Sequence, residues 1–177
     1  MILDENDFLT FQLYTASKTP RVKRARIRGW IITTLSFSVF AYLFHQSGNS
    51  LTGNLLLILS VLSLALYPLY SRWRYKQHYL RYIRDTYKHR YGETCELLID
   101  EDTIGSKDKS GIVKINKSEV TEVNEIKDYY FLKAQSGMTL IISKTKADNI
   151  EEIKDEIKSL VMIHGAKHTV ELDWKWK

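Results

Sequence analysis

The stretch RIRGWIITTLSFSVFAYLF, residues 26–44, changes abruptly from basic to apolar residues, and the fold depends on how it is interpreted. It opens a region, residues 29–71, that contains no Asp, Glu, Lys or Arg. A second apolar block covers residues 55–70, and the segment between the blocks, HQSGNSLTGN, is rich in residues that favour turns. The pattern predicts two apolar helices joined by a short loop.

Each of these helices is long enough to cross a bilayer. Residues 29–45 and 53–71 lie near the lower end of the roughly 17 to 25 residues that a crossing helix needs. Neither segment has the charged face of a soluble amphipathic helix, and their Ser, Thr, Asn and Gln residues are tolerated in lipid. We therefore predict a transmembrane hairpin over residues 29–71. The alternative is a buried helical hairpin in a soluble α+β protein.

Basic residues flank the hairpin on both sides, whereas the connecting loop carries no charge. The positive-inside rule places both flanks, and with them both termini, in the cytoplasm. Tryptophan and tyrosine are enriched where a helix leaves the bilayer. Membrane-interface positions are therefore expected at Trp30, Tyr70, Arg72, Trp73 and Arg74.

Two further segments adjoin the hairpin. Residues 1–28 are expected to form an amphipathic helix, capped by Asp4 with Asp7 three residues later and ended by Pro20, followed by a basic flank. Its aromatic residues either pack on the cytoplasmic domain or bind the membrane surface.

Residues 72–93 are expected to continue the second crossing as a basic juxtamembrane helix. Its interleaved basic and aromatic residues favour anionic lipid headgroups over nucleic acid.

From residue 94 onward the pattern changes to short strands divided by turns. Residues 1–93 carry 13 Lys+Arg against 5 Asp+Glu, whereas residues 94–177 carry 13 against 16. Candidate strands cover residues 94–99, 103–107, 111–115, 120–126, 129–134 and 138–143, and YYFLKAQSGMTLIIS is the clearest hairpin. Asp148 and Glu151 predict the capping box of a following helix. The last residues form an edge strand or bind elsewhere.

The order of these parts resembles the YcxB-like family of small bacterial membrane proteins. The resemblance covers residues 1 to about 163. It is carried by LDENDFLTFQLYTASKTPRVKR, by INKSEVTEVNEIKDYYFLKA and by GMTLIISKTKADNIEEI. It implies a membrane α-helical hairpin plus an α+β cytoplasmic domain, residues 94–177, with an antiparallel sheet or small PH-like barrel covered by a C-terminal helix. The resemblance transfers no functional residue.

No catalytic constellation can be assembled from the sequence. The chain lacks a nucleophile elbow, a Walker A loop, a zinc-protease motif and a dinucleotide fingerprint. The single cysteine, Cys95, excludes an intramolecular disulfide and a Cys-rich zinc site. His164 and His168 are four residues apart, but Gly165 is expected to end the helix between them. We therefore expect neither an enzyme nor a cofactor or metal.

The expected function is a non-enzymatic protein of the bacterial inner membrane that displays its cytoplasmic domain to a protein partner. Trp174 and Trp176, or an edge strand, are the candidate contacts, although these tryptophans can equally pack on the domain or enter the membrane interface. A more specific version is an immunity-type inhibitor of a toxin. The alternative is a membrane-structural or anionic-lipid-binding protein without a dedicated partner.

Overall fold

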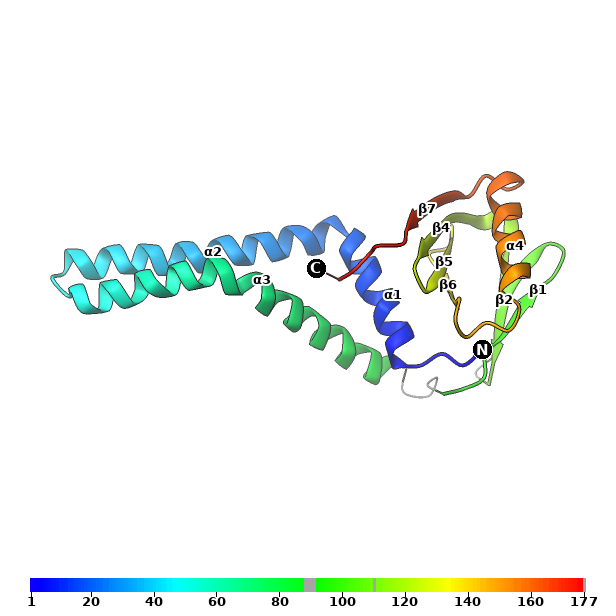
Figure 1. Ribbon diagram of the computed structural model, residues 1–177, viewed down its shortest axis with the longest axis horizontal. Helices are drawn as coiled ribbons and strands as arrows, with labels where there is room; N and C mark the ends of the chain where they lie inside the picture. Colours follow the sequence, from blue (N-terminus) through cyan, green and yellow to red (C-terminus); the bar gives the residue numbers. More distant parts are fainter. Residues whose placement is uncertain (88–91, 110, 177) are drawn as a thin grey trace. The chain divides into compact units, whose positions relative to one another are not determined.

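The computed structural model describes residues 1–87, 92–109 and 111–176 (Figure 1). Three helices, α1 (Glu5–Lys18), α2 (Pro20–Gln46) and α3 (Ser50–Thr86), come first in the chain. The strands are β1 (Glu96–Ile99), β2 (Thr103–Asp108), β3 (Gly111–Asn116), β4 (Val120–Ile126), β5 (Tyr129–Ala134), β6 (Thr139–Ser143) and β7 (Lys167–Glu171). Helix α4 (Ile150–Met162) lies between β6 and β7 in the sequence. The predicted α+β class is confirmed.

The described residues divide into two compact units. We call residues 12–81 with Trp176 the helical unit, and residues 1–11 with the described part of 82–175 the β-rich unit. The sequence predicts that residues 1–11 belong to a separate N-terminal segment, residues 1–28. In the structure these residues fold with the strands.

The helix boundaries follow from local chemistry. Helix α1 ends at Lys18 and α2 begins at Pro20, whose missing N–H is not needed in a first turn, so the predicted stop at Pro20 is confirmed. A turn of three residues, 47–49, separates α2 from α3. The Asn49 side-chain oxygen accepts the Thr52 N–H at 3.2 Å and so caps α3.

Helix α3 continues through Pro68 and ends at Thr86. The predicted basic helix over residues 72–93 is thus a continuation of the second apolar helix, as expected, but it is shorter than predicted. Gly92 and Glu93 are not helical, and residues 88–91 of that prediction lie outside the described residues. Figure 1 shows α3 turning away from α2 along its length, and a proline inside a helix is the usual cause of such a bend.

The strands form two sheets, one antiparallel and one mixed, where the prediction was an antiparallel sheet or a small barrel. Strands β1, β2 and β3 make an antiparallel meander. The second sheet has the order β6-β5-β4-β7, in which β7 lies parallel to β4 and the other pairs are antiparallel. Of the two alternatives for the C-terminal residues, the edge strand is the one observed over residues 167–171. The predicted hairpin of residues 129–143 is confirmed as β5 and β6.

The core of the β-rich unit lies between these sheets and α4. Leu132 and Ile142 from the second sheet and Leu160 from α4 have no exposed surface, and Ile104 and Ile115 bring the first sheet into the same cluster. Burial of one such aliphatic side chain contributes about 1.5–3 kcal/mol. Ile153, Ile157 and Leu160 therefore form the face of α4 that packs on the strands.

The predicted cap of α4 was wrong by one residue. Asn149 occupies the N-cap position, and its side chain makes no capping bond but donates to Glu152 at 2.6 Å. The Asp148 carboxylate lies 3.5 Å from the amino nitrogen of Met1. Asp148 thus lies one residue before the N-cap, with its side chain in an exposed ion pair.

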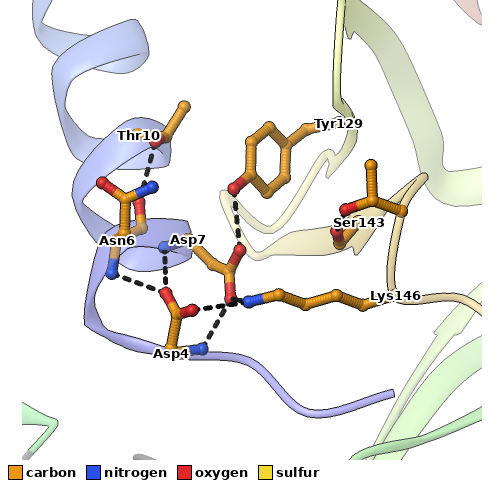
Figure 2. Close-up of polar contacts among 8 residues, drawn as sticks. Asp4, Asn6, Asp7, Thr10, Tyr129, Ser143 and Lys146 are labelled. Atoms are coloured by element: carbon orange, nitrogen blue, oxygen red, sulfur yellow. Dashed lines mark hydrogen bonds and ion pairs between the residues drawn. The ribbon is translucent and has the colours of Figure 1, made fainter.

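A buried polar cluster joins residues 1–11 to the second sheet (Figure 2). The Asp7 carboxylate, 1% exposed, accepts hydrogen bonds from the Tyr129 hydroxyl at 2.7 Å, from Lys146 Nζ at 2.6 Å and from the Asp4 N–H at 2.5 Å. The Asp7 N–H donates to Asp4 Oδ1 at 3.1 Å, which completes the predicted cap of α1. A second hydrogen bond of Lys146, to Asp4 at 2.7 Å, lowers the pKa of Asp4. Burial, and then the Asp7 carboxylate, raise the pKa of Tyr129.

The aromatic residues of the first helix also pack in this unit. The Phe8 ring stacks on Tyr87 with centroids 4.8 Å apart, and the Phe11 ring lies 5.4 Å from that of Phe131. Packing on the domain is thus the alternative that the structure shows for these residues.

Candidate membrane-interface site

Helices α2 and α3 carry a largely exposed apolar surface. Both are long and apolar enough to cross a membrane, and only 6% of the most apolar window of α2 and 11% of that of α3 is buried. A helix in the core of a soluble protein would bury this surface, so its exposure argues against the soluble alternative. The exposed apolar side chains include Ile31, Ile32, Leu35, Phe40, Leu43, Leu55, Leu57, Ile58, Leu62, Leu66 and Leu69.

Small polar side chains hold the two helices together. Ser38 and Ser60 share a hydrogen bond of 2.7 Å between their hydroxyl oxygens, and Thr34 and Ser63 share one of 2.8 Å. Ala41 is 1% exposed and Ser60 is 6% exposed, so this face lies in the contact. Small residues that allow close approach, with hydroxyls that bond across helices, are typical of helix pairs in membranes.

Near each end of the α2–α3 pair, an aromatic ring from one helix packs against a glycine of the other. A Cβ atom on Gly29 would lie 2.2 Å from the Tyr67 hydroxyl, and one on Gly53 would lie 2.6 Å from Cδ2 of His45. No other residue has room at these two positions without a shift of the ring. Together the two ring contacts fix how far one helix can slide along the other.

A cavity of about 190 Å³ opens between α2 and α3 at their basic end. Its polar lining comes from Lys23 and Arg26 on α2 and from Ser71 on α3. Trp30 also lines it, and the Trp30 indole nitrogen is buried without a hydrogen-bond partner among the described residues. The other lining residues are Ile27, Tyr67 and Pro68.

Arg26 is held in place by three neighbours. Its Nε donates to the Ser71 hydroxyl at 3.1 Å. Its guanidinium carbon lies 4.9 Å from the centroid of the Trp176 ring and 5.9 Å from that of Tyr75. Stacking of this kind orients the planar guanidinium and leaves N–H groups at its edge for a ligand.

Of the five predicted interface residues, one lines this cavity. Trp30 lines it directly, whereas Tyr70 and Trp73 are exposed and form a row of rings with Tyr67, with centroids 6.0 Å and 6.3 Å apart along the row. Arg72 and Arg74 have exposed side chains. Lys23, Arg26 and Ser71 were not singled out from the sequence. Only the pairing of the two helices shows that they share a cavity.

The two candidate partner-binding tryptophans belong to different units. The Trp176 indole N–H donates to the Arg72 carbonyl at 3.2 Å, so this side chain is engaged within the helical unit. Trp174 belongs to the β-rich unit, where it is partly buried and its backbone N–H donates to the Glu171 carbonyl at 3.0 Å. They are not a single exposed patch within one unit.

A second candidate surface lies in the β-rich unit, where edge strands of the two sheets line one cavity of about 230 Å³. Val113 and Ile115 of β3 and Leu140 of β6 are among its walls. Ile112 and Val113 remain 58% and 37% exposed. An exposed edge strand offers free backbone N–H and C=O groups to another strand, so β3 can accept an extended peptide.

Several titratable groups of the β-rich unit form ion pairs. Glu125 accepts from Lys144 at 2.7 Å and lies 3.0 Å from His168 Nε2. Burial raises the pKa of Glu125, but the hydrogen bond and charge of Lys144 outweigh it, and the net effect lowers that pKa. Burial, followed by Glu125, raises the pKa of Tyr130 to about 12. Among the described residues no group of three His, Cys, Asp or Glu side chains can hold a metal ion.

The chain matches no protein-family profile, no curated protein and no solved structure. Its function must therefore be argued from its own residues.

Proposed function

We propose that this chain is a non-enzymatic protein of the bacterial inner membrane that belongs to the YcxB-like family. In this proposal α2 and the apolar part of α3 cross the membrane, and both termini lie in the cytoplasm. The β-rich unit, a small PH-like domain, binds a protein partner at the cytoplasmic face. An immunity-type inhibitor of a toxin is the more specific version.

One observation carries this proposal. The exposed apolar helix pair has basic residues at both outer ends and none in its turn, and the same chain carries a folded β-rich unit with an exposed edge strand. Lipid is the solvent that such helices need, and the charge asymmetry favours cytoplasmic ends. The β3 edge, with the cavity beside it, is the contact surface that the geometry favours.

Affinity purification of the full-length protein in mild detergent tests the partner-binding function. We expect one stoichiometric partner that the wild type retains and Val113→Lys loses, because a lysine on β3 introduces a charge at the edge and the cavity wall. Ile163→Lys is the matched control, since Ile163 is 74% exposed and does not line the cavity. Equal capture by both variants would exclude the β3 edge as the contact.

Cysteine labelling tests the topology. In a Cys95→Ser background, an impermeant thiol reagent applied to intact spheroplasts should label Ser50→Cys, next to the turn, and leave Lys109→Cys unlabelled. Labelling of Lys109→Cys alone would reverse the orientation.

A second function, anionic-lipid binding without a dedicated protein partner, is favoured by a separate observation. Arg72, Arg74 and Lys76 all have exposed side chains on α3 next to its apolar part. Each such cation near an anionic bilayer contributes about 1 kcal/mol. If the purified protein captures no protein and retains anionic lipid in a salt-sensitive way, this function replaces the first.

A further inference from the structure

We propose that the cavity between α2 and α3 is a binding site for the phosphate group of an anionic phospholipid. The site consists of Lys23, Arg26, Trp30 and Ser71. This inference rests on the proposed membrane anchoring and adds to it a defined ligand class and a defined place.

The polar lining is chemically suited to an anion. Lysine, arginine and the indole N–H are donors without acceptor capacity, and a serine hydroxyl can donate as well. The lining includes no carboxylate, and no Asp or Glu occurs in the sequence between Asp7 and Asp85. A phosphate oxygen in the cavity would therefore meet donors from two helices and no competing acidic residue in the lining.

The buried Trp30 nitrogen gives an independent reason to expect an acceptor there. A buried donor without a partner destabilises the folded protein, and native structures keep few of them. The Trp30 indole N–H has no acceptor among the described residues, although it belongs to a residue that lines the cavity. A ligand oxygen would remove this destabilisation.

Arg26 is already oriented for such a ligand. The bond from its Nε to Ser71 and the stacking on Trp176 fix the guanidinium plane before a ligand arrives. Among the described residues Arg26 has no carboxylate partner within ion-pair distance. An arginine that is oriented but not neutralised binds phosphate oxygens through the N–H groups at its edge.

The surroundings favour a lipid over soluble phosphate. Ile27 and Pro68 line the same cavity, and the adjacent surface exposes Ile31 and Leu69 to 56% and 57%. A phospholipid places its phosphate near the membrane interface and its acyl chains along such a surface. Inorganic phosphate would leave that apolar surface uncovered.

The test uses the full-length protein in mild detergent with phosphatidylglycerol as the probe, followed by native mass spectrometry. We expect Lys23→Gln and Arg26→Gln each to weaken lipid binding about tenfold, because each removes a charged donor that bonds the phosphate directly. Arg24→Gln and Arg28→Gln are the matched controls, because they remove the same charge from the same helix but do not line the cavity. The controls should change binding less than twofold.

Because Arg26 also bonds Ser71 across the helix pair, loss of binding in Arg26→Gln could reflect a disturbed helix pair, so Trp30→Phe provides a second readout. It replaces the indole with a smaller aromatic ring that lacks the N–H, and we expect weaker phosphatidylglycerol binding with little loss of thermal stability. Equal binding by the wild type, Trp30→Phe, Lys23→Gln and the controls would overturn the site. Displacement of the lipid by inorganic phosphate at equal concentration would overturn the lipid assignment. Release of the wild type from membranes by alkaline carbonate would instead refute the anchoring itself.

Discussion

The buried Asp7 cluster permits a quantitative test of how residues 1–11 contribute to the β-rich unit. The test compares Tyr129→Phe, Asp7→Ala and the double variant. Asp7 is 1% exposed and accepts from the Tyr129 hydroxyl, the Lys146 ammonium and the Asp4 N–H (Figure 2). The Tyr129 residue is 8% exposed, so water cannot readily replace a lost partner.

The magnitudes follow from what each change leaves behind. Tyr129→Phe removes one hydrogen bond to a charged acceptor and should lower the free energy of unfolding by about 1.5–3 kcal/mol. Asp7→Ala leaves the hydroxyl and the ammonium without their shared buried acceptor and should cost about 3–5 kcal/mol. The double variant should fall short of the sum by about 0.5–3 kcal/mol, because the two residues are in direct contact.

Hydrogen exchange with mass spectrometry, on the full-length protein in detergent, measures these free energies for the β-rich unit alone. A loss of 3–5 kcal/mol corresponds to exchange about 10²- to 10⁴-fold faster in peptides from β4 and β5, since about 1.4 kcal/mol is a factor of ten. Tyr82→Phe is the control, because Tyr82 is 46% exposed, and it should change stability by less than about 0.5 kcal/mol. If Asp7→Ala exchanges no faster than this control, the cluster does not stabilise the unit.

Three further outcomes are expected. Gly53→Leu should lower the stability of the helix pair by about 1–3 kcal/mol, because the new leucine side chain would collide with the His45 ring. Asn54→Leu, at an exposed position, is the control and should not lower it. Thermal circular dichroism in detergent measures both variants. Lys117→Met should lower the free energy of unfolding, measured by hydrogen exchange, by about 3–5 kcal/mol, because it leaves the largely buried Glu156 carboxylate without its partner at 2.9 Å. The double variant Lys117→Met with Glu156→Leu should recover most of that loss. The pKa of Tyr130 is raised to about 12, so the neutral Tyr130 side chain contributes its full stabilisation below about pH 10 and loses it between about pH 10 and 12. Tyr130→Phe removes this ionisation and should therefore move the midpoint of alkaline unfolding to higher pH in a circular-dichroism titration.

Features that depend on neighbouring residues could be predicted well from the sequence. The strands lie where alternating β-prone runs end in turns, and β5 (Tyr129–Ala134) coincides with its prediction. The helix stop at Pro20 and the cap of α1 also follow from residues no more than a few positions apart. The cap of α4 lies one residue later than predicted, at Asn149, because local patterns place a helix end only to within one or two residues.

Features that depend on distant pairs could not be predicted. Asp7 and Lys146 are 139 residues apart, and nothing in either segment marks the other as a partner. The parallel pairing of β7 with β4 likewise depends on where α4 returns the chain. The candidate site has the same origin, since Lys23 and Arg26 are only two members of a basic run until Ser71 is placed beside them.

The register of the helix pair is what gives this site its geometry. Thr34 and Ser38 lie one turn apart on α2, and Ser60 and Ser63 lie on one face of α3, so the sequence contains the polar stripe but not its alignment. The alignment is fixed by these hydroxyl pairs in the middle and by ring-on-glycine contacts near both ends. A slip of one helical turn would break all of these contacts together and would also part Arg26 from Ser71. In the proposal above, the residues near the turn therefore help to position the donors at the basic end, because the phosphate site depends on the register of the hairpin.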